Sequence, residues 1–289
     1  MLAALLTLAV PLDMDQIVDK DAKVEKISSG HKFTEGPAWT RDGKLIFSDI
    51  SGNKMYIVPG GQIDKSTVYR DPSGAVNGNT IGPDGLLYTA GHGSRNVTRT
   101  NKDGSVTVIA DKFEGKRFNS PNDLAHLKNG DLYFTDPAYG LGRAPAELDF
   151  KGVFVLRKNG KLEALVRDFE TPNGIVFSPD EKLCYVADTQ RQHVRVFDVA
   201  KDGTLANGRI FAEKIEGYPD GMRVDVKGNL YVSAKGIQVY SPKGERLGAI
   251  PVPETPTNCA WGDKDAKGLY ITAQSSVYKV RCKIKGVRF

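Results

Sequence analysis

One short pattern occurs six times along this chain of 289 residues: a turn of the Asp-Gly type, followed by a strand-like run of apolar and aromatic residues. Such turns between apolar runs are the strongest short-range signal of a β-hairpin, because they need residues that tolerate positive φ. The turn positions recur every 40 to 51 residues and are Gly43, Gly85, Gly130, Glu181, Gly228 and Gly268. A period near 45 residues is typical of propeller blades. The chain is therefore predicted to be all-β, a six-bladed β-propeller.

The segment before each turn also repeats, and its first residue is always an acid or an amide. Five of these residues lie eight positions before their turn; Asn258 lies ten before Gly268, where we expect a turn lengthened by two. The set is Glu35, Asn77, Asn122, Asn173, Asp220 and Asn258. Equivalent positions of all blades fall on a ring around the propeller axis. We therefore expect these side chains to surround one mouth of a central channel, and we call them the ring.

The ring combines two carboxylates with four amides and contains no Lys or Arg to neutralise them. Converging hard oxygen atoms suit a divalent cation such as Ca²⁺ or Mg²⁺. The alternative is a structural ring, in which the amides satisfy backbone groups at the crowded channel. The spacing favours the metal site and leaves the structural ring open.

The sequence predicts structure in four further segments. A short helix is expected at Leu12 to Ile17, and residues 137–152 form the longest stretch without a strand pattern. A long loop at a propeller face is a candidate lid or substrate wall. Residues 18–29 and 276–282 are candidates to pair in one sheet, as a clasp between the two ends of the ring of blades.

Composition excludes several kinds of partner. The formal charge is +5, but acids and bases are mixed and no run of five like charges marks a nucleic-acid arm or a polybasic anchor. We expect no nucleic-acid and no membrane partner. Cys184, Cys259 and Cys282 form neither a disulfide framework nor a CxxC pair, and are expected to be core thiols.

The N-terminal sequence MLAALLTLAVP is apolar but too short to span a bilayer. It is either the remnant of an export signal, which implies a periplasmic or secreted protein, or an apolar segment that packs on the domain of a cytoplasmic one. Residues 1–20 are assigned to this segment, and residues 21–289 to a single propeller domain.

No Gly-rich phosphate loop, HExxH or GxSxG motif occurs, so phosphoryl transfer, zincin and α/β-hydrolase chemistry have no sequence support. His92 and Arg95 follow a blade strand and are candidates to face a substrate pocket, as is Arg143 in the long loop; the alternative for Arg143 is an ordinary solvated side chain. His126 is expected to face outward from its strand.

Asp136 and Tyr139 follow one strand and are candidates to line the same pocket. Asp49 and Asp188 occupy the same repeat position as Asp136, however, which favours a structural role at the blade corners.

Five segments together carry a family resemblance: EGPAW at 35–39, NSPNDL at 119–124, LYFTDPAYGL at 132–141, PNGIVFSPD at 172–180 and YPDGMRVDVKGNLYV at 218–232. With them the chain resembles the family of senescence marker protein (regucalcin), gluconolactonase and luciferin-regenerating enzyme. The sequences NSPNDL and FTDPAYGL are similar to those of the bacterial gluconolactonase-like branch of this family.

The resemblance implies a cation held by Glu35, Asn173 and Asp220. It also implies that Asn122, or Asn119 if the alignment slips, contacts the substrate or the attacking water. Asn77 and Asn258 are then neighbours of the site. The expected ion is Ca²⁺, with Mg²⁺, Mn²⁺ or Zn²⁺ as alternatives.

The implied reaction is hydrolysis of a lactone, with a sugar lactone such as gluconolactone first among the small-molecule substrates. The cation polarises the carbonyl and activates the water, and Asp220 accepts the proton of that water. The alternatives are an organophosphate or ester hydrolase on the same site, or a non-catalytic calcium-binding propeller. A monomer or weak dimer is expected.

Overall fold

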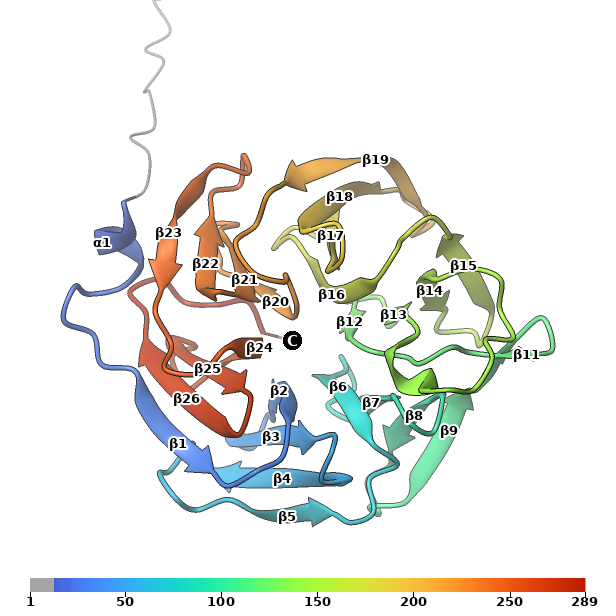
Figure 1. Ribbon diagram of the computed structural model, residues 1–289, viewed down its shortest axis with the longest axis horizontal. Helices are drawn as coiled ribbons and strands as arrows, with labels where there is room; N and C mark the ends of the chain where they lie inside the picture. Colours follow the sequence, from blue (N-terminus) through green and yellow to red (C-terminus); the bar gives the residue numbers. More distant parts are fainter. Residues whose placement is uncertain (1–12, 289) are drawn as a thin grey trace, which may run out of the picture.

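The computed structural model describes residues 13–288, and within that range six four-stranded antiparallel sheets stand around one axis as blades (Figure 1). Blades one to three are β2 Thr34–Trp39, β3 Lys44–Asp49, β4 Lys54–Pro59 and β5 Thr67–Arg70; β6 Val76–Ile81, β7 Leu87–Gly91, β8 Asn96–Thr100 and β9 Val106–Ala110; and β12 Leu124–His126, β13 Leu132–Asp136, β14 Gly152–Leu156 and β15 Leu162–Val166. Blades four to six are β16 Pro172–Phe177, β17 Leu183–Asp188, β18 His193–Val199 and β19 Leu205–Ala212; β20 Met222–Val224, β21 Leu230–Ala234, β22 Gly236–Tyr240 and β23 Arg246–Ile250; and β24 Pro256–Gly262, β25 Gly268–Ala273 and β26 Ser276–Arg281 with β1 Glu25–Ser29. The predicted six-bladed propeller is confirmed.

Little regular structure lies outside the blades. A hairpin of β10 Lys112–Phe113 and β11 Lys116–Arg117 follows blade two. The short helix α1 covers Met14–Ile17, close to the predicted range, and the 3₁₀ helix η1 covers Tyr139–Leu141 in the long loop. Across the part of the chain that the structure describes, no helix has the length and apolar character needed to cross a membrane.

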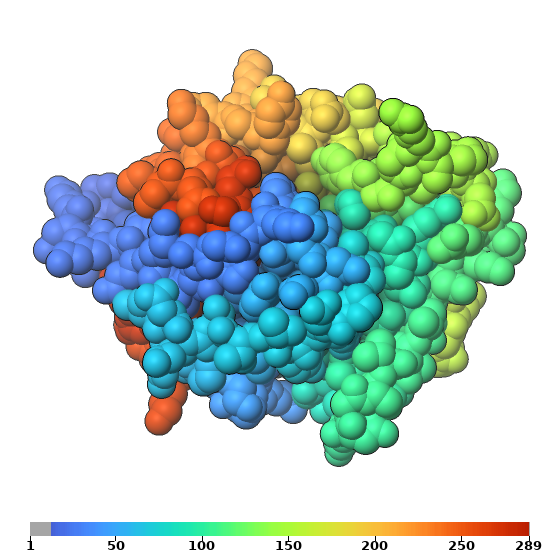
Figure 2. Space-filling view, turned by 60° about the horizontal axis from the view of Figure 1, so that its bottom comes forward, coloured from blue at the N-terminus to red at the C-terminus, as the bar shows by residue number. Residues whose placement is uncertain are grey.

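The last blade joins the two ends of the chain. β1 pairs with β26 from Glu25 opposite Lys279 to Ser29 opposite Ser276, and Val18 forms a further bridge with Cys282. Figure 1 shows β1, in blue, beside the red β26, and Figure 2 shows N-terminal residues packed against C-terminal ones at the surface. The predicted clasp is confirmed. The apolar segment 1–11 lies outside the described residues.

The inner hairpin turns keep one geometry in all six blades. In five blades the predicted turn residues have positive φ, from 60° at Glu181 to 98° at Gly130. In blade six the residue with this conformation is Ala266, with φ 57°, and its N–H donates to Asp263 O as Gly43 N–H donates to Thr40 O in blade one. The predicted lengthening of this turn was wrong. Gly268 begins β25, and Asn258 lies eight residues before its turn like the other ring residues.

Aromatic side chains join neighbouring blades. Tyr231 of blade five packs edge-on against Trp261 of blade six, with ring centroids 4.9 Å apart. Tyr133 of blade three meets Phe177 of blade four at the same distance, and its hydroxyl donates to Gly203 O. The three cysteines are free and buried, as expected.

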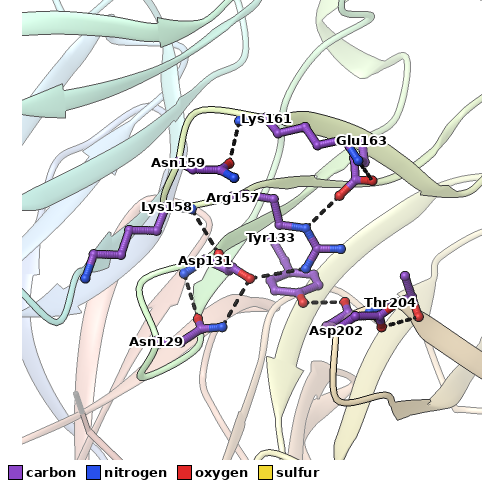
Figure 3. A network of polar contacts seen from close by, with 11 residues as sticks. Asn129, Asp131, Tyr133, Arg157, Lys158, Asn159, Lys161, Glu163, Asp202 and Thr204 are labelled. Carbon is purple, nitrogen blue, oxygen red and sulfur yellow. Dashed lines mark hydrogen bonds and ion pairs between the residues drawn. The ribbon is translucent and has the colours of Figure 1, made fainter.

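A polar network covers this junction between blades three and four (Figure 3). Arg157 donates to the carboxylates of both Asp131, at 3.1 Å, and Glu163, at 2.7 Å. Arg157 directly follows β14, and its guanidinium lies by the turn between β12 and β13, at the end of blade three opposite to Asn122.

Candidate functional site

The ring residues lie at or just before the start of the innermost strands β2, β6, β12, β16, β20 and β24. Strand pairing is interrupted at the ring position or directly after it in blades one, two and four, as between Glu35 and Ala38. Such a bulge bends the strand and redirects its side chains. The repeat thus places one acid or amide per blade at the same end of the channel.

Glycines allow the ring residues to approach one another. A Cβ at Gly36 would lie 2.1 Å from Asn77 O of the next blade, and one at Gly174 would lie 2.3 Å from Asp220 O. Gly78 and Gly221 occupy the same position in blades two and five, and face Asn122 O and the Asn258 side chain in the same way. Any larger side chain at these positions would push the blades apart, so the glycines set the width of the ring.

Glu35 is 2% exposed and accepts hydrogen bonds at Oε2 from Gly36 N–H, at 2.5 Å, and from Asn258 Nδ2, at 3.1 Å. Burial raises its pKa to about 7, and the nearby Asp123 carboxylate acts in the same direction, against the two hydrogen bonds. Burial, with the charges of Glu35 and Asp123, also raises the pKa of Asp220 well above its usual range. The surroundings of these carboxylates supply too little positive charge to keep their pKa values low, and a bound cation would stabilise their ionised forms.

Asn173 has a free oxygen in this environment. Its Nδ2 donates to Thr189 Oγ1 at 3.0 Å, and that hydroxyl donates to Pro219 O, so the orientation of the amide is fixed. The buried Oδ1 has no hydrogen-bond partner among the described residues. An orphaned amide oxygen beside two carboxylates is a suitable donor set for a hard cation. Within residues 13–288 no group of three or more His, Cys, Asp and Glu side chains is arranged to hold a metal.

Two charged residues beside the ring were not predicted from the sequence. Asp123, directly after Asn122, is fully buried, and burial raises its pKa. Arg223 lies three residues after Asp220, with Nη1 3.8 Å from Asp123 Oδ2. The ring itself contains no basic side chain, as predicted, but Arg223 approaches it from β20 through Asp123. The available signal was the position after the ring residue, where four blades have Gly and blade three has Asp.

The long loop approaches the site through Tyr139 of η1. Burial raises the pKa of the Tyr139 hydroxyl, and the Asp220 charge adds to this, while the side chains of Thr189 and Asn173 act against it. Gly140 N–H donates to Ser120 Oγ, and Asn119 Nδ2 donates to Phe150 O, which fasten the two ends of the loop to blade three.

The other residues predicted to contact the substrate lie in the ring, in blade two and on the long loop. His92 Nδ1 lies 3.0 Å from Ser120 Oγ, beside the loop, and burial lowers its pKa. Arg95 is buried, donates to Phe118 O and lies 3.4 Å from Glu147 of the loop. Arg143 is exposed on the loop. Asn77 and Asn122 are buried in the ring.

The acids at the blade corners and one histidine can also be assigned. Asp136 accepts from the N–H groups of Asn119 and Ser120, and Asp49 and Asp188 make equivalent bonds, which confirms the corner role. The expectation for His126 was wrong. It is buried against Tyr88 of blade two, with ring centroids 4.5 Å apart, because β12 is an innermost strand with no solvent-facing side.

The fold and the site define a class of protein: six-bladed propellers with a ring of acids and amides at one mouth of the channel. The model of the SMP-30/Gluconolactonase/LRE-like region matches residues 33–275, and the chain belongs to this family. It is 35% identical to a gluconolactonase of Zymomonas mobilis, over 94% of this chain and 85% of the relative. A solved gluconolactonase structure from Xanthomonas campestris is 32% identical with a TM-score of 0.87, and the match covers 93% of this chain and 92% of that one. A structure from Agrobacterium tumefaciens, described as the calcium-binding protein regucalcin, has a TM-score of 0.79 at 18% identity; 92% and 96% of the two chains are covered, and this similarity shows the fold alone.

Proposed function

We propose that this protein is a lactonase that hydrolyses a sugar lactone and depends on a divalent cation held by Glu35, Asn173 and Asp220. The observation that carries the proposal is the convergence of the buried Glu35 carboxylate, the partly accessible Asp220 carboxylate, both with raised pKa, and one unpartnered amide oxygen at the channel mouth. Similarity to gluconolactonases over nearly the whole chain supports the reaction. Calcium is the first candidate ion, ahead of Mg²⁺, Mn²⁺ and Zn²⁺, because all three donors are hard oxygens and two are carboxylates.

When bound, the cation supplies a Lewis acid that stabilises negative charge on the lactone carbonyl oxygen. Asp220, partly accessible at the mouth, accepts the proton of the attacking water. Burial raises its pKa, and the neighbouring Asn173 side chain and Gly221 backbone act in the opposite direction, toward the ionised form that a proton acceptor needs. Asn122 and Asn77 present amides to the substrate from the neighbouring blades. His92, Arg95 and Arg143 are the proposed contacts from blade two and the long loop.

The test is hydrolysis of δ-gluconolactone, followed as acid release with a pH indicator. The wild-type protein should lose activity after treatment with EDTA and regain it when Ca²⁺ is added. Asp220→Ala and Glu35→Gln should abolish activity while the circular dichroism spectrum stays that of the wild type. Asp198→Ala, which removes an exposed carboxylate on β18, is the matched control and should retain full activity.

Three results would overturn the proposal. Full activity of Asp220→Ala would refute the role of Asp220 as proton acceptor. Activity that chelators leave unchanged would refute the dependence on a cation. If no lactone in a panel of sugar and aliphatic lactones is opened, but Ca²⁺ still raises the melting temperature, the ring is a structural ion site.

A further inference from the structure

Asp123 places a third carboxylate beside the ring, at a position where four of the other blades have no side chain. It is 1% exposed; Oδ1 accepts from Leu124 N–H at 2.9 Å, and Oδ2 has no hydrogen-bond partner among the described residues. The Asn258 side chain lies between this carboxylate and Glu35, because it donates to Glu35 Oε2 and stabilises the charge of both acids. Asp123 is therefore part of the same electrostatic unit as the ring.

Arg223 is the positive member of this unit. It projects from β20 of blade five, its side chain is 16% exposed, and Nη1 donates to Met222 O at 2.7 Å. The guanidinium helps to lower the pKa values of both Asp123 and Glu35, which come from blades three and one. One arginine thus acts on carboxylates from two other blades.

A cavity of about 80 Å³ lies inside the channel, along the inner strands below the ring. Arg223 lines it with His126, Trp39, Phe177, Trp261 and Arg288. Its other walls are mainly apolar, and Arg288 donates instead to Asp263 O and Lys264 O. Arg223 is consequently the basic side chain placed to balance the buried acids.

The net charge of these four side chains matches a divalent cation. Glu35, Asp123 and Asp220 carry three negative charges when ionised, and Arg223 carries one positive charge, so the net charge is that of two carboxylates. A divalent cation neutralises this set, and a trivalent cation leaves it one positive charge in excess. Because the interior screens charges poorly, one unit of excess charge has a large effect on the choice of ion.

We propose that Arg223, paired with Asp123, is the built-in counter-charge that makes the channel mouth selective for divalent over trivalent cations. The inference rests on the cation site of the proposed function. Removal of the Arg223 charge leaves three uncompensated carboxylates. The affinity for Tb³⁺ relative to Ca²⁺ then rises by about tenfold or more, as expected for one unit charge within roughly 10 Å at an effective dielectric constant near 20.

The experiment measures dissociation constants for Ca²⁺ by calorimetry and for Tb³⁺ by luminescence, on full-length wild type and variants. Arg223→Met should raise the Tb³⁺ preference at least about tenfold. Arg223→Lys keeps the charge and should leave the preference close to that of the wild type. The double variant Asp123→Asn/Arg223→Met removes both charges and should restore the wild-type preference. Arg157→Met, which removes a similarly buried paired arginine outside the channel, should leave the preference unchanged.

The outcomes separate this inference from the proposed function. If the wild type binds neither ion, the cation site itself is refuted. If the wild type binds Ca²⁺ and Arg223→Met has an unaltered Tb³⁺ preference, the counter-charge role is refuted while the cation site stands. If Arg223→Met does not fold, the double variant and Arg223→Lys decide: a changed preference in either one contradicts the inference.

Discussion

Glu35→Gln tests the electrostatics of the ring without any substrate. Glu35 has its pKa raised from 4.5 to about 7, so the folded protein holds this proton more tightly than the unfolded chain does. A carboxyl group with a raised pKa destabilises the fold progressively as the pH rises from its unfolded pKa to its folded pKa. That rise corresponds to about 3 kcal/mol once the pH exceeds 7. Gln keeps an oxygen for Gly36 N–H and Asn258 Nδ2 and carries no charge.

We therefore expect Glu35→Gln to be more stable than the wild type in EDTA at pH 8, by up to about 3 kcal/mol. The difference should vanish at pH 4.5, where Glu35 is protonated in the folded protein. Saturating Ca²⁺ should stabilise the wild type but not the variant, since the variant lacks one ligand. Urea unfolding in the presence of EDTA or Ca²⁺ at the two pH values measures these quantities. A variant less stable than the wild type in EDTA at pH 8 would refute the reasoning.

Three further predictions concern the scaffold. Gly174→Ala places a Cβ 2.3 Å from Asp220 O and should lower the free energy of unfolding by about 3 kcal/mol and remove most of the lactonase activity. The control Gly160→Ala, at φ 89° with open space around it, should lower the free energy of unfolding by about 1–2 kcal/mol and leave the activity unchanged. Urea unfolding and the lactone assay distinguish the two variants. Arg157→Met removes the ion pair of Asp131 and leaves Glu163 with Lys161 alone (Figure 3), and should lower stability by about 2 kcal/mol with activity intact; lost activity would contradict a purely structural role. Val277→Asp introduces a charge into the fully buried side of β26 at the clasp and should cost about 4 kcal/mol or more; thermal unfolding checks this, and an unchanged melting temperature would show that the clasp contributes little.

The sequence predicted the blades well because each blade repeats one local rule. Asp-Gly turns require positive φ, and the alternating apolar strands after them have one period, so both features can be read without knowledge of distant contacts. The misplaced turn at Gly268 shows the limit of this rule. The segment DKDAKG contains two candidate positions, and Ala266 takes the left-handed conformation that a Gly would be expected to take.

The site was predictable only as far as the repeat extends. Glu35, Asn173 and Asp220 share one register, and the fold turns that register into a ring. Tyr139 approaches the ring through a loop that has no repeat, and His126 is buried because of a neighbouring blade that local sequence does not describe. Contacts of this kind depend on the closed arrangement of six blades, and no local pattern encodes them.

The departures from the repeat carry the chemistry that we propose. Ring symmetry alone would give six equivalent side chains, and a symmetric ring of amides would have no net charge to attract a cation. Glu35 and Asp220 break this symmetry in blades one and five, and Asp123 breaks the glycine pattern in blade three. Arg223 then offsets one of the three charges from within the channel. In the proposed site, the same four residues would set both where a cation binds and which cation charge is preferred. Substitutions that keep the total charge should preserve that preference even when they move a charge between blades.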